Sequence, residues 1–393
     1  MKKILAILLA TAMMLALLPA TVLAETQSGT WGGIDWSLTD DGTLTIAPTT
    51  GTPVPDAKCG KTYEVGAWRE AVIYDSTGNG IDIGGWPFDR TKVTKLVIKE
   101  GVTSIGSFTA QGFTNLTGEV IIPSTVTYIG QEAFQKSTFT TLTFAEGGTE
   151  ELCIAQGAFK NLIIETVALP ADRPVHLHAW VFNNCHELKS ATLPATVTKV
   201  WGTNHIDYFK NFEEHSNPTW TNSSEIFAYD EKLETITFGS ETVRDMFFAN
   251  NNGTNRDYVV AYSGVIAYAD LQEALDAAAE GDGEVVILKN ITLAAGETHT
   301  IPAEVTLTIP SGKTLTNKGT IYVVSSGKFD GTLTNVDDGT VIYVYEVTFL
   351  ADGETIATVY VPSGDDAELP DIPEKAGHSA AWDHDGKNIT ADT

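Results

Sequence analysis

The chain has 393 residues, with 51 aspartates and glutamates against 24 lysines and arginines, and its formal net charge is −27 at pH 7. Binding to nucleic acid needs clustered lysine and arginine that displace counterions from phosphates, and an anionic membrane surface needs the same. The composition therefore argues against both partners. Hydrophobic residues make up 42% of the chain, which is enough to build packed cores. The length predicts two or three domains of about 100–200 residues each.

The N-terminus has the three parts of an export signal. Lys2 and Lys3 form a short basic segment, and residues 4–18 are a continuous apolar run. Val22 and Ala24 supply small residues at the two positions that a cleavage site requires. The apolar run is shorter than the ~20 residues that span a bilayer. We therefore expect cleavage after Ala24 and a mature protein, without a transmembrane span, that is secreted or held at the cell surface.

The three cysteines, Cys59, Cys153 and Cys185, cannot all pair within one chain. An exported chain could form one disulfide, and the sequence does not choose which. The cysteines and histidines show neither a CxxC motif nor a histidine-rich spacing, so the sequence does not predict a structural zinc site.

A short apolar strand, often followed by proline, recurs through the middle of the chain. The strands end at residues 98, 122, 144, 169, 193 and 238, at intervals of 22 to 25 residues and one longer interval of 45. One coil of about 23 residues cannot bury its own strand, so a regular period predicts a solenoid of stacked coils. A row of phenylalanines keeps the same period and is expected to line the opposite wall: Phe88, Phe113, Phe134, Phe159, Phe182 and Phe227.

These repeats carry a resemblance to a known family. The segment Ile122–Phe134, Ile-Pro-x-x-Val-Thr-x-Ile-Gly-x-x-Ala-Phe, resembles the BspA-type leucine-rich repeat of bacterial surface proteins. Phe182–Leu188 is similar to the Phe-x-x-Cys-x-x-Leu step of that family, and Trp36–Ile46 to the β-hairpin cap that often precedes such repeats. The resemblance implies an N-terminal β cap over residues 25–88 and repeats over residues 89–249.

The chain changes character after a polar, turn-rich break at Asn250–Gly253. Asp270–Glu273 is typical of a capping box and predicts an amphipathic helix to about Ala279. Short threonine- and valine-rich runs follow, and residues 258–345 resemble a few coils of the right-handed β-helix of pectin-lyase-like modules. Residues 346–393 resemble an InlB-type B-repeat that ends abruptly, so we expect this small β module to be incomplete. The predicted fold class is mainly β with short helical or irregular segments.

Catalytic and metal-binding interpretations have less support. A polysaccharide lyase would need a lysine or arginine base beside clustered acids, but the basic residues of the β-helix-like segment are scattered, so we predict no enzyme activity. His176 and His178 would share a strand face, which could suit a metal, yet the pattern shows no third ligand and surface histidines are favoured. Asp337–Gly339 and Asp365-Asp366 could hold calcium loosely, although acidic turns usually meet solvent. We predict no cofactor.

The largest interruption of the repeat, Trp201–Ser224, is rich in aromatic residues, which give a binding surface large contact area at low entropy cost. The alternative is that these residues only cover the side of an enlarged coil. The resemblance implies a non-catalytic adhesin that binds host matrix proteins or other cells. A carbohydrate-binding accessory protein and, less favoured, a polysaccharide lyase are the alternatives. The candidate binding residues are Trp201, His205, Tyr208, Phe209, Phe212 and Trp220.

Overall fold

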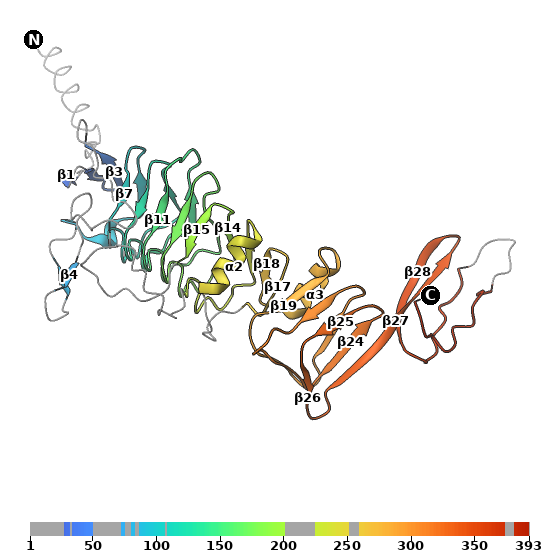
Figure 1. Ribbon diagram of the computed structural model, residues 1–393. Helices are drawn as coiled ribbons and strands as arrows, with labels where there is room; N and C mark the ends of the chain where they lie inside the picture. Colours follow the sequence, from blue (N-terminus) through green and yellow to red (C-terminus); the bar gives the residue numbers. More distant parts are fainter. Residues whose placement is uncertain are drawn as a thin grey trace, which may run out of the picture.

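The computed structural model describes residues 27–31, 34–49, 72–74, 80–82, 86–106, 108–200, 225–250, 259–373 and 381–392. They form an elongated row of stacked coils, followed by a second group of coils and a long hairpin (Figure 1). The predicted fold class, mainly β and built as a solenoid, is confirmed. The predicted export signal, residues 1–24, and the aromatic-rich interruption of the repeat, residues 201–224 (the aromatic insertion), lie outside the described residues. In the described part of the chain, no helix is long and apolar enough to cross a membrane.

An antiparallel cap begins the described chain. It consists of β1 (Gln27–Trp31), β2 (Ile34–Leu38) and β3 (Thr43–Pro48), and β3 pairs in parallel with β6 (Lys95–Ile98), the first strand of the solenoid. Trp36 of the cap packs against Trp86 and Phe88, with ring centroids 5.9 and 5.3 Å apart. The cap is therefore continuous with the solenoid core. The short strands β4 (Val72–Tyr74) and β5 (Gly80–Asp82) pair with each other, and a 3-10 turn, η1, covers Arg90–Lys92.

The coils place their strands in two rows, one on each side of the core. The first row follows the predicted repeat: β8 (Glu119–Ile122), β10 (Thr141–Phe144), β12 (Thr166–Ala168), β14 (Ser190–Leu193) and β16 (Thr235–Phe238). Within this row β8 pairs with β10, and β12 with β14 and then β16, all in parallel. The second row is one parallel sheet: β7 (Ser104–Ile105), β9 (Tyr128–Ile129), β11 (Leu152–Ile154), β13 (Val175–Leu177) and β15 (Val197–Val200).

The predicted phenylalanine row forms a stack through the core. Phe134, Phe159, Phe182 and Phe227 are buried, and successive rings lie nearly parallel with centroids 5.3, 5.4 and 5.7 Å apart. Phe247 of α2 (Glu241–Asn250) lies 6.0 Å beyond Phe227 and closes the stack. The predicted burial of these rings at equivalent positions of adjacent coils is confirmed.

A buried arginine lies in the coil after Leu169-Pro170, where Arg173-Pro174 stands in place of the Val-Thr of the repeat. Arg173 is 1% exposed, and its Nη1 donates to the carbonyl oxygens of Ser124 and Val126 at 2.6 and 2.8 Å, reaching across the intervening coil. Burial lowers the pKa of the Arg173 guanidinium, against the opposing effect of nearby Asp172 and Glu100. The side chain therefore ties this coil to the backbone of the coil two steps earlier.

The strand direction reverses at a small hairpin between the two groups of coils. β16 pairs antiparallel with β18 (Ile266–Tyr268), β18 with β17 (Ala261–Ser263), and β17 with β19 (Glu284–Ile287). One eight-stranded sheet thus runs through both groups, in the order β12-β14-β16-β18-β17-β19-β22-β25. The two solenoids share a sheet, with their strands running in opposite directions.

The second group of coils has three faces, and the strands within each face are paired in parallel. Its helix α3 (Leu271–Ala279) ends where the sequence predicted, and the Asp270 side chain caps it by accepting from the backbone N–H of Glu273 at 3.0 Å. The buried amide of Asn317 donates to Asn335 Oδ1 at 2.9 Å, which joins successive coils at one corner. The faces are β19, β22 (Thr306–Thr308) and β25 (Lys328–Asp330); β20 (Ile291–Leu293), β23 (Leu315–Asn317) and β26 (Leu333–Asn335); and β21 (Thr298–Ile301), β24 (Thr320–Val324) and β27 (Thr340–Ala351).

The last strand of the second group extends beyond the coils. β27 pairs antiparallel with β28 (Glu354–Pro362), and the hairpin has its own small core around Val347, Phe349 and Val361. The predicted domain boundaries, and the resemblance of these two segments to pectin-lyase-like and InlB-type modules, stay predictions.

Candidate functional site

The residues that the sequence predicted as a binding surface cannot be placed. All six lie between residues 201 and 224, outside the described part of the chain. The described residues contain three features with functional potential: a cluster of one cysteine and two histidines, an exposed threonine-rich face, and a groove in the second group of coils.

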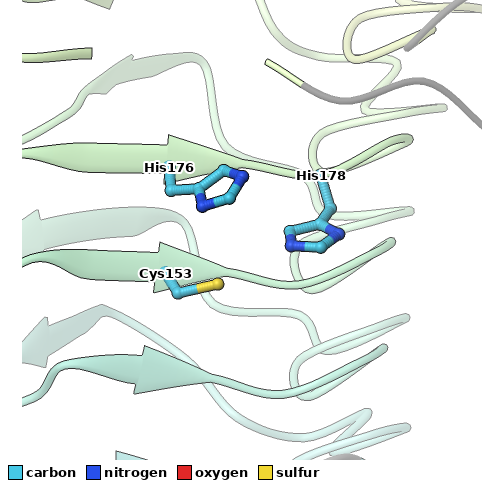
Figure 2. Close-up of side chains that lie close together, drawn as sticks. All are labelled: Cys153, His176 and His178. Carbon is cyan, nitrogen blue, oxygen red and sulfur yellow. The ribbon is translucent and has the colours of Figure 1, made fainter. Parts of the chain in front are cut away.

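The cysteine–histidine cluster is built by the pairing of β11 with β13. Leu152 and Ile154 point into the core, so Cys153 between them faces outward; Val175 and Leu177 orient His176 in the same way. The parallel register places Cys153 directly beside His176. His178 follows on the same outer side, and its backbone N–H donates to Ile154 O at 3.0 Å. Figure 2 shows the three side chains projecting from the same side of the two neighbouring strands.

These outward side chains are buried. Cys153 and His176 are 1% exposed and His178 is 7% exposed, and one potential ligand atom from each lies within 4.8 Å of the others. The two imidazole rings stack with centroids 5.0 Å apart. The prediction that His176 and His178 are surface histidines is therefore wrong, because outward orientation in this sheet does not mean exposure. The sequence also missed Cys153 as the third member of the cluster.

The cysteines divide into two kinds. Cys153 is disulfide-bonded, whereas Cys185 is a free, buried thiol. The Cys185 Sγ donates to Phe159 O at 3.3 Å, and burial together with the nearby Asp230 raises the pKa of this thiol. Cys185 is therefore a packed structural thiol, at the repeat position that Ser137 and Asp230 occupy in other coils. Cys59 lies outside the described residues.

Burial, with a smaller contribution from Lys199, lowers the pKa of His176 to about 4. The imidazole is therefore neutral at pH 7, which is the form that binds metal ions. In an unfolded chain its pKa returns to about 6.5. Between pH 6.5 and pH 4, His176 is protonated in the unfolded state but neutral in the folded state. The free energy of unfolding must therefore decrease as the pH falls through this range.

We expect His176 to destabilise the fold by about 3 kcal/mol between pH 7 and pH 4, since each pKa unit is worth about 1.4 kcal/mol. Urea unfolding of the wild type and of His176→Asn at several pH values would measure this. The variant should lose less stability over the same range. Equal losses would show that His176 titrates normally in the folded chain.

The outer side of β10, β12, β14 and β16 forms what we term the threonine face. Inward residues of these strands are buried, whereas the outward ones are small, mostly hydroxyl-bearing and exposed or half-buried. The register aligns Thr166 with Ser190 and Thr235, and Thr192 with Thr237. The full set is Thr141, Thr143, Thr166, Ala168, Ser190, Thr192, Thr235 and Thr237.

A groove of about 600 Å³, lined by both polar and apolar residues, lies between α3, the β21 region and the terminal hairpin. Gln272 is held in place, because its amide nitrogen donates to Asp276 Oδ1 at 2.8 Å and its amide oxygen accepts from the Thr300 N–H at 2.7 Å. The exposed ring of Tyr360 and the carboxylate of Glu346 line the hairpin side. Hydroxyl, amide and carboxylate groups beside one aromatic ring can hydrogen-bond and stack on a polar ligand.

Residues 77–152 and 149–255 match the family described as BspA type leucine rich repeat region, in six copies. The match covers the elements from β5 to α2 and supports the BspA-like interpretation of this part of the chain. No curated protein matches the sequence.

Solved structures give further likenesses. A leucine-rich repeat protein from Eubacterium ventriosum has 15% sequence identity and a TM-score of 0.36, with 82% of this chain and 74% of that chain covered. A leucine rich cell surface protein from Faecalibacterium prausnitzii has 17% identity and a TM-score of 0.29, with 80% and 76% covered. A leucine-rich repeat protein from Bacteroides ovatus has 16% identity and a TM-score of 0.28, with 80% and 78% covered.

Proposed function

We propose that this chain is a non-catalytic, secreted or cell-surface repeat protein that binds an extracellular protein partner. The observation that carries the proposal is the alternation of buried and outward-facing residues along the strands of each coil. The apolar residues that repeat are buried, and the residues between them on β10, β12, β14 and β16 face outward and are exposed or half-buried. A solenoid of this kind offers an extended surface whose outward residues can change without cost to the core.

The threonine face is the described surface best suited to such contact. It is broad and regular, and the strands beneath it are fixed by the shared core, so a partner meets a surface that loses little entropy on binding. The net charge of −27 adds long-range attraction for a basic partner, which accelerates association and weakens as salt rises. Host matrix proteins and other cell surfaces are the partners that the BspA-like repeats suggest.

A panel of immobilised matrix proteins, probed with the mature chain, would test the proposal. We expect the double variant Thr166→Arg, Thr192→Arg to abolish binding to any partner found, because two long charged side chains would block the face. Thr198→Arg is the matched control, since Thr198 is an exposed threonine on β15 of the other sheet. Equal binding by the double variant and the control would show that the threonine face is not the binding surface.

The aromatic insertion is the second surface that we propose for contact with the partner. Aromatic anchors with a polar rim supply most of the binding energy of a small patch. Replacing residues 201–224 with a short Gly-Ser bridge should then abolish binding and leave circular dichroism and melting near those of the wild type. Unchanged affinity in the deletion variant would show that the partner does not contact this insertion. The threonine-face double variant would then show whether the partner contacts the threonine face.

Carbohydrate binding is the second candidate function, and the groove beside α3 favours it. Its hydroxyl and amide groups, with Asp276, Glu346 and the exposed Tyr360, match the polar edges and apolar faces of a sugar ring. A glycan array probed with the wild type and with Tyr360→Ala would test this function, since loss of the ring should remove any specific signal. Incubation with uronic-acid polymers, followed by ultraviolet absorbance, would reveal the lyase activity that this proposal denies.

A further inference from the structure

We propose that Cys153, His176 and His178 form a site for a borderline-soft metal cation of the Zn²⁺ class when Cys153 is reduced to a thiolate. The oxidation state of Cys153 would then select between a disulfide and a metal site at the same place. This inference does not depend on the partner-binding function.

The geometry is close to what such a cation needs. Zinc lies about 2.3 Å from a thiolate sulfur and about 2.0–2.1 Å from an imidazole nitrogen, so tetrahedral ligand atoms are roughly 3.5 Å apart. The ligand atoms of the three residues already lie within 4.8 Å of one another. Rotation of the side chains can close the remaining gap without moving the strands. Two of the three residues belong to paired strands whose inward neighbours are locked in the core.

The donor set determines the class of metal. One thiolate and two neutral imidazoles favour Zn²⁺, Co²⁺ or Cu⁺ over Ca²⁺ and Mg²⁺, which prefer oxygen ligands. Burial adds a second reason, because a buried thiolate is unfavourable alone and a bound cation compensates its charge. Three protein ligands leave one coordination position of a tetrahedral ion for another donor.

The switch between the two states is a two-electron reduction. A dithiol reductant breaks the S–S bond of Cys153, delivers two electrons and two protons to give two thiols, and leaves as a cyclic disulfide. Metal binding then releases the proton of the Cys153 thiol to solvent, while each imidazole donates a lone pair and keeps its other N–H. Dithiol and metal are therefore both required for the chain in its disulfide form.

Cobalt titration of the full chain tests the site, because thiolate-bound Co²⁺ has a charge-transfer band in the near ultraviolet. The wild type in its disulfide form should show no band. The band should appear after reduction with a dithiol that is then removed without air, and also in Cys59→Ser, because Cys185 is a free thiol buried elsewhere in the core. Zn²⁺ should displace the cobalt and remove the band.

Matched variants identify the ligands. Cys185→Ser in the Cys59→Ser background should retain the band, because Cys185 is buried elsewhere in the core. Cys153→Ser in that background should abolish it, and His176→Asn with His178→Asn should weaken binding at least roughly tenfold. Circular dichroism checks that each variant is folded.

A second measurement uses only the wild type. Zn²⁺ should raise the melting temperature of the reduced chain and not of the disulfide form, since a ligand stabilises the state that binds it. The proposal is overturned if the folded, reduced chain shows neither a cobalt band nor a zinc-dependent melting shift. It is equally overturned if the band persists in Cys153→Ser.

Discussion

Replacement of Phe159 by alanine should lower the free energy of unfolding by about 3–5 kcal/mol. The ring is fully buried and lies between Phe134 and Phe182, with centroids 5.3 and 5.4 Å away, while Phe144 meets its edge at 6.2 Å. Alanine removes the transfer free energy of the ring and leaves a cavity. The coils on both sides are held by their own strand pairing, so the walls of the cavity cannot collapse to fill it.

Urea denaturation of the wild type and the variant would measure this loss. Ile163→Ala is the matched control in the same coil, because Ile163 is 42% exposed and its truncation should change stability by about 0.5 kcal/mol or less. Phe159→Leu should fall between the two, since it keeps part of the apolar volume. A loss below about 1 kcal/mol for Phe159→Ala would contradict the stacked arrangement of the phenylalanines.

The phenylalanine stack could be predicted because one coil repeats another. Each phenylalanine sits at a fixed distance from an apolar strand, so the two patterns confirm each other along the sequence. The predicted strands also agree with the structure to within one residue at several places: Leu96–Ile98 lies within β6, and Ala191–Leu193 within β14. Buried repeat positions leave a sequence signal because the core demands the same shape in every coil.

The cysteine–histidine cluster could not be predicted in the same way. Cys153 meets His176 only through the register of β11 and β13, and both strands follow irregular segments, residues 145–151 and 170–174. The Val-Thr motif that marks the second row of strands is absent from these two coils. An alignment of Leu152-Cys153-Ile154 with Val175-His176-Leu177, as two apolar residues flanking an outward one, would have revealed the pair.

The reversal of strand direction after β16 also could not be predicted from the sequence. The chain's break at residues 250–253 suggested the start of a separate module, and the short strands β17 and β18 carry no period. Their turn uses Gly264 with φ of +53°, a conformation that favours glycine. What the sequence does not show is that this hairpin inserts between the two solenoids as part of one sheet.

The β17–β18 hairpin covers the edge of the last strand of the first solenoid, β16. We expect a chain of residues 25–250 to fold, because stacked coils are stabilised by nearest neighbours, but to associate into dimers and larger species. In the whole protein β18 covers the outer edge of β16 through the pairs Ile236–Ala267 and Thr237–Ile266. Truncation at Asn250 would leave the unpaired N–H and C=O groups of β16 free to pair with another molecule.

A chain of residues 25–269 is the matched comparison, because it keeps the β17–β18 hairpin and the buried Val259 and Ala267 that contribute to the core of the first solenoid. Its new edge, β17, has only three residues, and short edges pair less readily. We therefore expect it to be monomeric by light scattering after size exclusion and to melt at a higher temperature than the shorter chain. Two equally monomeric chains would show that the edge of β16 is not what the hairpin protects. An unfolded 25–250 chain would mean that the first solenoid cannot form without the hairpin, and that the two groups of coils fold as one unit.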